Sequence, residues 1–328
     1  MIKTIIKRIP GFSYINKIRK DFDFNKDKSF YLKNYMYSKP INQSKLEYDM
    51  LLEIHKLEKG FAVQNPRVFG IDKVKRIIKD INEYEKKEYD KKSFSYNLAY
   101  SSLEQYMNFF EEKLWKDTDE YHIVSEFMKN KKNYEFVKVG AFDLKKEDII
   151  KKAKIDYDGF ISSRRSIRNF SSKPLNEKDI IDAINMAIKT PTACNRQMCK
   201  IYYMKTNDSK RVIEKYAQGL GLFDLTNANY FVVTFDINAN YFIGERNQGW
   251  FNSGLVTMNF VNALHSLGIG SCCIQFGNTF KEEREFKKML NIPNSERIGV
   301  IVTAGYYDDI SRIPYSTRKP INEIYFER

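Results

Sequence analysis

The sequence predicts an α+β protein, in which a mainly helical first part precedes a mixed domain of helices and strands. Apolar residues recur at helical spacing through residues 44–155, whereas residues 156–328 alternate helical and strand-like segments. A polar, Lys-rich connector spans residues 142–157, so we place a domain boundary near residue 155. We therefore expect a basic arm at 1–43, a helical domain at 44–155 and a second domain at 156–328.

Composition narrows the classes of partner. The chain has 328 residues, a net charge of +13 and an isoelectric point near 9.3, which favours an anionic partner: a phosphorylated cofactor, an anionic membrane surface or nucleic acid. Four cysteines, all after residue 190, are too few for a disulfide framework and indicate a reducing cytoplasmic location. We find no stretch near the roughly 20 apolar residues of a membrane span and no signal peptide.

The basic arm admits two interpretations. Residues 1–40 hold ten Lys and Arg against three Asp, and their Ile and Phe residues recur roughly on one helical face, although Pro10-Gly11 interrupts it. One interpretation is a peripheral anchor on an anionic membrane. The other is a solvated arm whose apolar residues pack on the body of the protein, and we favour it.

The helical domain is rich in aromatic residues. Segments 46–61, 74–85 and 96–115 keep helical spacing, and Gly60 indicates a break near the end of the first. An aromatic stripe at this spacing is far more often core than a cofactor site. His55 and Glu58 share one helical face and would suit a metal or an acid–base pair, yet a surface or interdomain hydrogen bond is the favoured interpretation.

The second domain alternates its elements. Expected strands are Lys200–Met204, Tyr230–Ile237, Ser271–Phe276 and Ile298–Tyr306. Expected helices are Leu175–Lys189 with Asn176 as N-cap, Asn252–Leu267 and Phe280–Leu290. Because the helix Asn252–Leu267 is apolar nearly all round, it belongs in a core or at an oligomer interface.

Two motifs flank the first of these helices. Arg164-Arg165-Ser166-Ile167-Arg168 places three guanidinium groups and a hydroxyl in five residues, and arginine is suited to bidentate phosphate recognition. Pro191-Thr192-Ala193-Cys194-Asn195-Arg196-Gln197 forms a polar turn after the helix. Together they suit the two ends of an elongated anionic ligand. The Gly-rich fingerprints of dinucleotide-binding and P-loop proteins are absent from the sequence.

These motifs resemble those of the nitroreductase family of FMN flavoproteins. Two further segments strengthen the resemblance: the long apolar helix with its exit His265-Ser266-Leu267-Gly268-Ile269-Gly270, and the late basic motif Ser316-Thr317-Arg318-Lys319-Pro320. The four segments occur in the family's order across residues 156–328. The resemblance implies the mixed three-layer nitroreductase fold, a homodimer with two FMN sites at its interface, and NAD(P)H as electron donor to a small-molecule acceptor.

The resemblance also implies a set of FMN-binding residues. Arginines meet the phosphate, polar side chains meet the ring, and a backbone N–H in the loop after the long helix, at or near Gln275, meets N5. The set is Arg164, Arg165, Ser166, Arg168, Pro191, Thr192, Ala193, Asn195, Gln197, Cys273, Ile274, Gln275, Phe276 and Arg318. Since the flavin performs the redox chemistry, no side chain is expected to be strictly catalytic and no metal is expected.

The sequence departs from the family pattern at Met198-Cys199 and at Cys273, which leaves the choice of acceptor open. The first rival function is a dedicated flavoenzyme of a biosynthetic pathway. The second is a membrane- or partner-docking protein with a structural or lost flavin site.

Cys272-Cys273 are interpreted as buried free thiols rather than a redox pair. Arg164-Arg165 lack the setting of a nucleic-acid module, so no nucleic-acid partner is expected.

The helical extension has no counterpart in the minimal family domain. Its aromatic residues would suit a slot over a planar ring. We therefore hypothesise that residues 44–155 shape the acceptor site above the flavin rather than fold as an independent neighbour.

Overall fold

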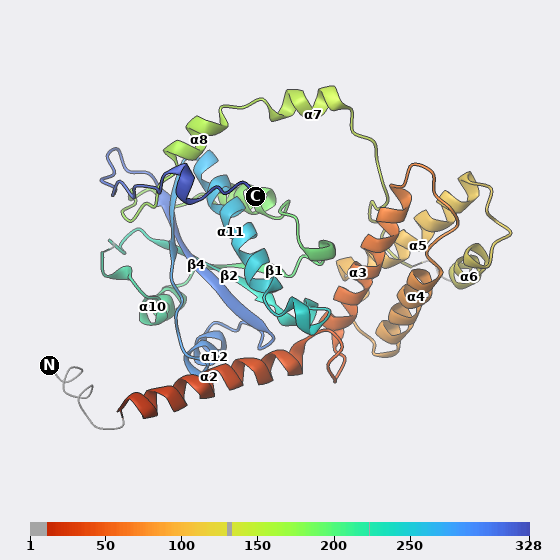
Figure 1. Ribbon diagram of the computed structural model, residues 1–328, viewed down its shortest axis with the longest axis horizontal. Helices are drawn as coiled ribbons and strands as arrows, with labels where there is room; N and C mark the ends of the chain where they lie inside the picture. Colours follow the sequence, from red (N-terminus) through yellow and green to blue (C-terminus); the bar gives the residue numbers. More distant parts are fainter. Residues whose placement is uncertain (1–11, 130–132, 223) are drawn as a thin grey trace.

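The computed structural model describes residues 12–129, 133–222 and 224–328 of the chain. Helices form the first half, and a four-stranded sheet covered by helices forms the second (Figure 1). Helices of the first half are α2 (Phe12–Asn34), α3 (Gln43–Phe61), α4 (Ile71–Lys86), α5 (Phe94–Glu112) and α6 (Asp119–Met128). Those that follow are α7 (Lys146–Ala153), α8 (Tyr157–Ser163), α9 (Glu177–Ala187), α10 (Asn207–Tyr216), α11 (Gln248–Ser266) and α12 (Phe280–Met289). The protein has the α+β architecture that the sequence predicts.

The sheet is antiparallel throughout, in the order β1-β2-β4-β3. Its strands are β1 (Cys199–Met204), β2 (Asn229–Asp236), β3 (Ile269–Ile274) and β4 (Glu296–Tyr306). All four lie where the sequence predicts strands, to within a few residues. Residues 230–236 of β2 are buried on both faces of the sheet, which explains the continuous apolar run at Val232-Val233.

Helices cover both faces of the sheet and make three layers. On one face, Ile180 and Ala183 of α9 pack with Phe260 of α11. On the other face, Ile213 of α10 packs with Phe286 of α12. Asn176 caps α9 as predicted, because its side chain accepts a hydrogen bond from the Lys178 N–H. This is the three-layer arrangement that the resemblance implies.

The long helix α11 begins at Gln248, four residues before its predicted start. Gly249 makes this possible, since a Cβ there would lie 2.0 Å from the ring of Phe235. Gly268, at φ +73°, then turns the chain into β3. Phe251 and Met258 remain 62% and 43% exposed, so one side of this apolar helix is uncovered within the chain.

The first half packs around aromatic side chains, as predicted. Tyr106 and Phe110 stack at 4.2 Å, and Tyr84 stacks on Tyr96 at 5.4 Å. Helix α3 packs against both α4 and α5 through its buried leucines and isoleucine. These rings are core residues rather than the lining of a cofactor site.

Helix α3 ends at Phe61, one residue after the break predicted at Gly60. A Cβ at position 60 would lie 2.2 Å from the ring of Phe69. The glycine therefore provides space for a ring from the following loop rather than a turn in the backbone.

The described part of the predicted arm is a long helix that packs on the second half. Phe30 of α2 meets Phe280 of α12 at a centroid distance of 5.5 Å, and Asp27 lies 3.0 Å from Arg297 of β4. In Figure 1, α2 runs below α12 and the sheet. Phe30 and Tyr31 therefore pack on the body as the favoured interpretation expects, whereas Phe22 and Phe24 are 58% and 73% exposed. Residues 1–11 lie outside the described part of the chain.

One apolar core crosses the boundary that we predict near residue 155. Met198, Phe235, Ile237 and Ala239 are buried in the same cluster as the side chains of α3, α4 and α5. Hydrogen bonds cross as well: the Met36 N–H donates to the Asn240 carbonyl at 2.9 Å. The two halves therefore support one another.

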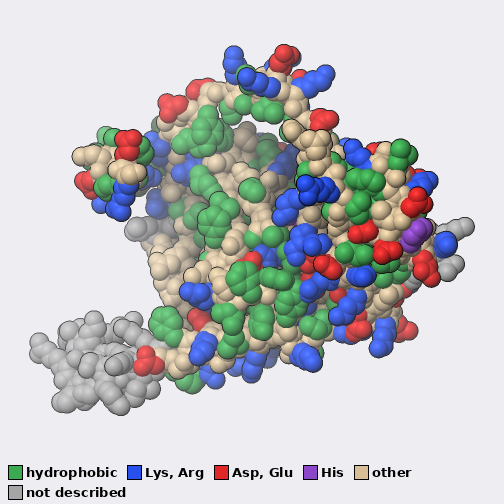
Figure 2. Space-filling view, turned by 45° about the vertical axis from the view of Figure 1, so that its right-hand side comes forward, with side chains coloured by type: hydrophobic (Ala, Val, Ile, Leu, Met, Phe, Trp, Pro, Cys, Tyr) green, Lys and Arg blue, Asp and Glu red, His purple; other side chains and the backbone are tan. Residues whose placement is uncertain are grey.

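The connector between the halves is not a plain loop. It contains α7, whose residues are all exposed, and it arches over the body between the two halves (Figures 1 and 2). Phe142 and Leu144 are 76% and 64% exposed. Across the described residues, no helix combines the length and apolar character that crossing a bilayer requires.

Candidate functional site

The basic loop lies along strand β3. Its Ile167 N–H donates to the Ser271 carbonyl at 3.0 Å, and the Ile167 side chain is buried against Gly270. Burial of this one side chain leaves its neighbours Ser166 and Arg168 accessible. The alternation of an extended strand therefore sets which residues of the motif are available to a ligand.

A cavity of about 210 Å³ forms where a late segment closes over this loop. The first group that lines it is Arg164, Arg165, Ser166 and Arg168. The second group is Ile313, Pro314, Tyr315, Ser316, Thr317 and Arg318. The structure thus brings together five of the predicted site residues from segments about 150 positions apart in the sequence. None of the lining residues is a carboxylate.

Arg164 is partly buried in this arginine cavity. Its Nε atom is buried without a hydrogen-bond partner in the described structure. The positive charge of Arg164 also affects a neighbouring group. Burial, together with this charge, lowers the pKa of His265. A buried donor without an acceptor, among arginines and with no carboxylate in the lining, is the electrostatic pattern of an anion site.

The end of strand β3 adjoins the same cavity. Burial raises the pKa of the Cys272 thiol, while Arg168, a hydrogen bond to Ser166 and Arg164 act in the opposite direction. Ile274 is buried and Phe276 packs on Phe286 at 4.8 Å. Two of the predicted residues, Ile274 and Phe276, therefore fix the loop by packing.

The other two predicted residues of this loop are accessible. Cys273 and Gln275 are exposed, and the Gln275 carbonyl accepts a hydrogen bond from the Gln218 N–H at 3.2 Å. Both cysteines are free, but only Cys272 is buried, so the expectation of two buried thiols is wrong for Cys273.

The polar turn Pro191–Gln197 lies elsewhere in the chain. It contains η1 (Ala193–Asn195), which packs against α3, and it does not line the arginine cavity. Asn195 and Gln197 are exposed and adopt φ near +50°, a conformation that Asn tolerates better than most residues. Within one chain, the structure does not bring this group to the arginines.

Arg196 holds the turn in place. Its side chain is fully buried and makes two 2.7 Å hydrogen bonds to the carboxylate of Glu245, in η4 (Ile243–Glu245). Its Nε donates to the Ala193 carbonyl at 2.9 Å. Sequence reasoning passed over Arg196 because it occupies a variable position of the motif, and its partner lies 49 residues away.

A second group that sequence reasoning missed is centred on His265. Its Nε2 lies 2.9 Å from the Ser163 hydroxyl and its Nδ1 lies 2.7 Å from the Tyr307 hydroxyl. The pattern of α11 places His265 on an apolar helix, and no local signal pairs it with residues 102 and 42 positions away. The group links α8, α11 and the end of β4 beside Arg164.

His55 and Glu58 form the hydrogen bond that we favour from the sequence. The Nδ1 and Oε2 atoms are 3.2 Å apart, and both side chains are partly exposed. No group of His, Cys, Asp and Glu with the makings of a metal site occurs among the residues that the structure describes.

Comparison with known proteins identifies the second half. Residues 161–306 match the nitroreductase family model, which leaves residues 1–160 and 307–328 outside it. A search of the curated proteins finds no match.

Several solved structures resemble part of the chain. A nitroreductase family protein from Streptococcus pneumoniae is 22% identical, with 53% of this chain and 100% of that one covered and a TM-score of 0.45. An FMN-dependent nitroreductase from Clostridium difficile is 20% identical, with 52% and 99% covered and a TM-score of 0.43. A nitroreductase in complex with FMN, from Desulfovibrio desulfuricans, is 18% identical, with 54% and 98% covered and a TM-score of 0.46.

Proposed function

Residues 161–306 form a nitroreductase-family domain, and from that premise we propose that the protein is an FMN-dependent oxidoreductase. We further propose that it passes a hydride from NAD(P)H to an electron-poor small molecule. The observation that carries the proposal is the arginine cavity, which gathers Arg164, Arg165, Arg168 and Arg318 around the hydroxyl of Ser166.

The residues present fit the phosphate end of FMN. The buried Nε of Arg164 needs an acceptor, and a phosphate offers several strong acceptor oxygens. The cavity of about 210 Å³ accommodates a phosphate and part of a ribityl chain rather than a whole flavin. The ring must therefore extend beyond it, towards the accessible edge of β3 at Cys273 and Gln275.

The second half of the proposed site comes from a second subunit. Pro191, Thr192, Ala193, Asn195 and Gln197 lie apart from the cavity within one chain. We infer that, in a homodimer with FMN at its interface, these residues of one subunit meet the ring of the cofactor whose phosphate the other subunit holds. The uncovered apolar side of α11 supports such a dimer.

When bound, FMN would supply the two-electron redox chemistry. The chain's own part is to bind and orient the cofactor. The arginines hold the phosphate, Ser166, Asn195 and Gln197 offer polar partners, and the loop of Cys273, Ile274, Gln275 and Phe276 borders the ring. We assign no side chain a proton-transfer role.

We also propose that the helical half borders the acceptor site. Helix α3 packs against η1, so the extension supports the turn that carries Asn195 and Gln197. Four free thiols fit a reducing compartment, and we propose a cytoplasmic location.

An absorbance spectrum of the purified protein tests the function. We expect a yellow protein that retains FMN and bleaches when NADPH or NADH is added without oxygen. A dedicated biosynthetic enzyme would bleach in the same way but would not turn over generic nitroaromatic or quinone acceptors. A colourless protein that does not take up added FMN would contradict the enzyme and favour a docking role.

A further inference from the structure

A second cationic site lies between α2 and α12, at the opposite end of β4 from the arginine cavity. Strand β4 starts beside α12, where Arg297 contacts Glu283 and Asp27, and its last residue, Tyr306, accepts a hydrogen bond from Ser171 of the segment after the basic loop. Eleven residues of strand separate the two sites by roughly 30 Å. A ligand of one site is therefore no reactant at the other.

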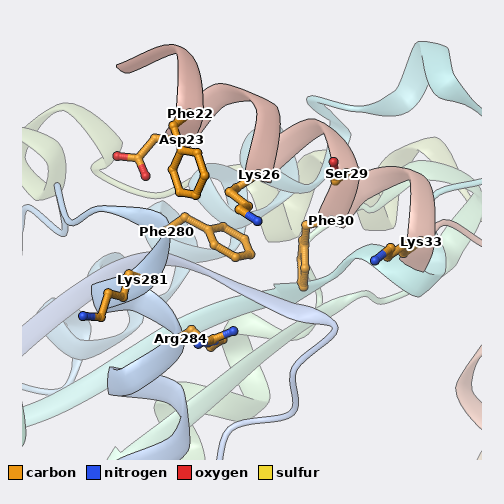
Figure 3. A pocket seen from close by; sticks show the side chains of 9 residues that line it. All are labelled: Phe22, Asp23, Lys26, Ser29, Phe30, Lys33, Phe280, Lys281 and Arg284. Carbon is orange, nitrogen blue, oxygen red and sulfur yellow. The ribbon is translucent and has the colours of Figure 1, made fainter. Parts of the chain in front are cut away.

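This α2–α12 groove has a volume of about 440 Å³, within the usual range of roughly 300–1,000 Å³ for small-molecule pockets. Its lining is Phe22, Asp23, Lys26, Ser29, Phe30, Lys33, Phe280, Lys281 and Arg284. Figure 3 shows Phe22 and Lys26 of α2 above the rings of Phe280 and Phe30, with Arg284 of α12 below them. Ring faces and aliphatic stems make an apolar floor, and cations stand around it.

Most of the positive charge in the groove is uncompensated. Four cations face one carboxylate, Asp23, which points away from Lys26 in Figure 3. Lys281 lies 3.8 Å from Glu285, a distance at which an exposed ion pair contributes little. Among the described residues, no carboxylate lies within ion-pair distance of Lys26, Lys33 or Arg284. Lys26 instead lies over the Phe22 ring at 4.8 Å.

The walls of the groove are held by partly buried contacts. Phe30 meets Phe280 edge to face at 5.5 Å, and the guanidinium of Arg297 binds both Asp27 of α2 and Glu283 of α12. The relative position of the two helices is thus fixed beneath the floor. A site with rigid walls loses little conformational entropy when a ligand binds.

We propose that this groove binds a nucleotide, with its base against Phe22 and Phe280 and its phosphates between Lys26, Lys33 and Arg284. Aromatic faces stack on planar bases, and Arg and Lys are the side chains that bind phosphate. A flat bilayer suits this shape less well, because Phe30 and Phe280 are partly buried at the floor. Because the groove lies far from the arginine cavity, a nucleotide bound here would be separate from the proposed FMN.

The test is a calorimetric titration of the full-length protein, kept in excess FMN, with ADP. Adenosine and inorganic phosphate are titrated separately as the two parts of the ligand. We expect ADP to bind at least about tenfold more tightly than either part, because stacking and charge act together. Absence of ADP binding at millimolar concentration overturns the proposal.

Variants locate the site. Lys26→Glu and Arg284→Glu should each weaken ADP binding by about tenfold or more, and Phe22→Leu should weaken it several-fold. Lys28→Glu makes the same charge change on the exposed surface of α2 outside the groove and should leave the affinity within about twofold. Arg164→Ala should also leave the ADP affinity within about twofold, since it changes only the arginine cavity. Equal losses in Lys28→Glu and Lys26→Glu would mean non-specific attraction and would overturn the site.

Two further probes distinguish other anions. Vesicles containing phosphatidylserine and an acidic polyglutamate peptide are tested for binding by co-sedimentation and calorimetry. Binding of either one that depends on Lys26 and Arg284, without binding of ADP, rules out the nucleotide. Competition of ADP with these probes at the groove supports it.

Discussion

At the scale of single residues, the buried Nε of Arg164 is the strongest sign of a ligand. Two other arginines of the cavity each donate a hydrogen bond to a nearby backbone carbonyl. Arg165 donates to the Arg164 carbonyl, and Arg318 donates to the Ser316 carbonyl. Such contacts shape the loops and leave the remaining N–H groups of these two guanidinium groups available to an anion. The arginine cavity is therefore organised before any ligand arrives.

Removing one arginine should weaken FMN binding. We expect Arg164→Ala and Arg318→Ala each to cost about 1.5–3 kcal/mol of binding free energy, the value of a charge-assisted hydrogen bond. Fluorescence titration of the apoprotein with FMN measures the change. Arg211→Ala on the exposed face of α10 is the control. A double variant of Arg164 and Arg318 that retains stoichiometric FMN would contradict the assignment.

The buried Asp80 of α4 makes the free energy of unfolding depend on pH. Burial and the neighbouring Asp49 carboxylate raise the pKa of Asp80 to about 8, and its Oδ2 is buried without a partner. Between the ordinary pKa of 3.8 and about 8, the folded state holds a proton that the unfolded chain releases. The contribution of Asp80 to the free energy of unfolding therefore falls as pH rises through this window.

Asp80→Asn should remove that loss, because asparagine stays neutral. We expect the variant to gain about 1–3 kcal/mol at pH 8 relative to wild type, and less at pH 5. Urea unfolding at both pH values measures the difference. Glu126→Gln, on the exposed surface of α6, should show no such pH dependence. A variant that is equally destabilised at both values would mean that Asp80 makes a structural contact instead.

At the scale of elements, the turn after α9 depends on one ion pair. Cys194, Asn195 and Gln197 all have positive φ, a costly backbone for residues other than glycine. The fully buried Arg196 holds this conformation through Glu245, and Glu245 also accepts from the Tyr241 N–H at 2.6 Å. The turn and η4 are therefore one unit.

Arg196→Met should destabilise the fold strongly, because it leaves the Glu245 carboxylate without its buried partner. We expect a loss of about 3–5 kcal/mol in the free energy of unfolding. Chemical denaturation measures it. Glu245→Gln, which keeps one acceptor for Arg196, should lose less. If Arg196→Met unfolds like wild type, the ion pair does not hold the turn.

At the scale of the whole molecule, exposed apolar side chains on α11 indicate an interface with a partner. Trp250, Phe251 and Met258 expose 44%, 62% and 43% of their area, and Phe242 and Ile243 just before the helix expose more than half. Hydrophobic side chains reach the surface over the middle of the body, below the connector (Figure 2). Several exposed apolar side chains on one helix and just before it are a common mark of an interface.

A dimer through α11 should be disrupted by charge. We expect wild type to be a dimer at micromolar concentration by light scattering, and Phe251→Glu with Met258→Glu to be a monomer that binds FMN more weakly. We expect weaker FMN binding because, in the proposed dimer, Asn195 and Gln197 of the second subunit would no longer reach the cofactor. Val63→Glu, another exposed apolar position, is the control. A monodisperse wild-type monomer would count against the interface.

The shared core predicts that the second half does not stand alone. Residues 150–328 expressed by themselves would expose Met198, Phe235, Ile237 and Ala239, which are now buried against α3, α4 and α5. Each large apolar side chain left exposed forfeits about 1.5–3 kcal/mol. We therefore expect aggregation or loss of cooperative thermal unfolding, measured by circular dichroism. A truncated protein that folds and turns over the same acceptors with unchanged kcat/KM would exclude a role for the helical half in the site.

Local patterns in the sequence determined the four strands and several of the helices of this protein. The strands at Val232-Val233 and Val300-Ile301-Val302, the cap at Asn176 and the aromatic core of the first half follow from propensity and periodicity, which act between near neighbours in the chain. The two basic segments around Arg164 and Arg318 were also evident in the sequence, because clustered arginines are suited to binding an anion.

Tertiary structure alone decided which of these segments meet. It brought Arg164 to Arg318 and His265 to Tyr307, and it kept Asn195 apart from the arginine cavity. It also joined Phe30 to Phe280 to form the α2–α12 groove, and it gave Gly60 a packing role beside Phe69. The physical reason is that these contacts depend on how helices and strands distant in sequence share buried area, and no single segment carries that information.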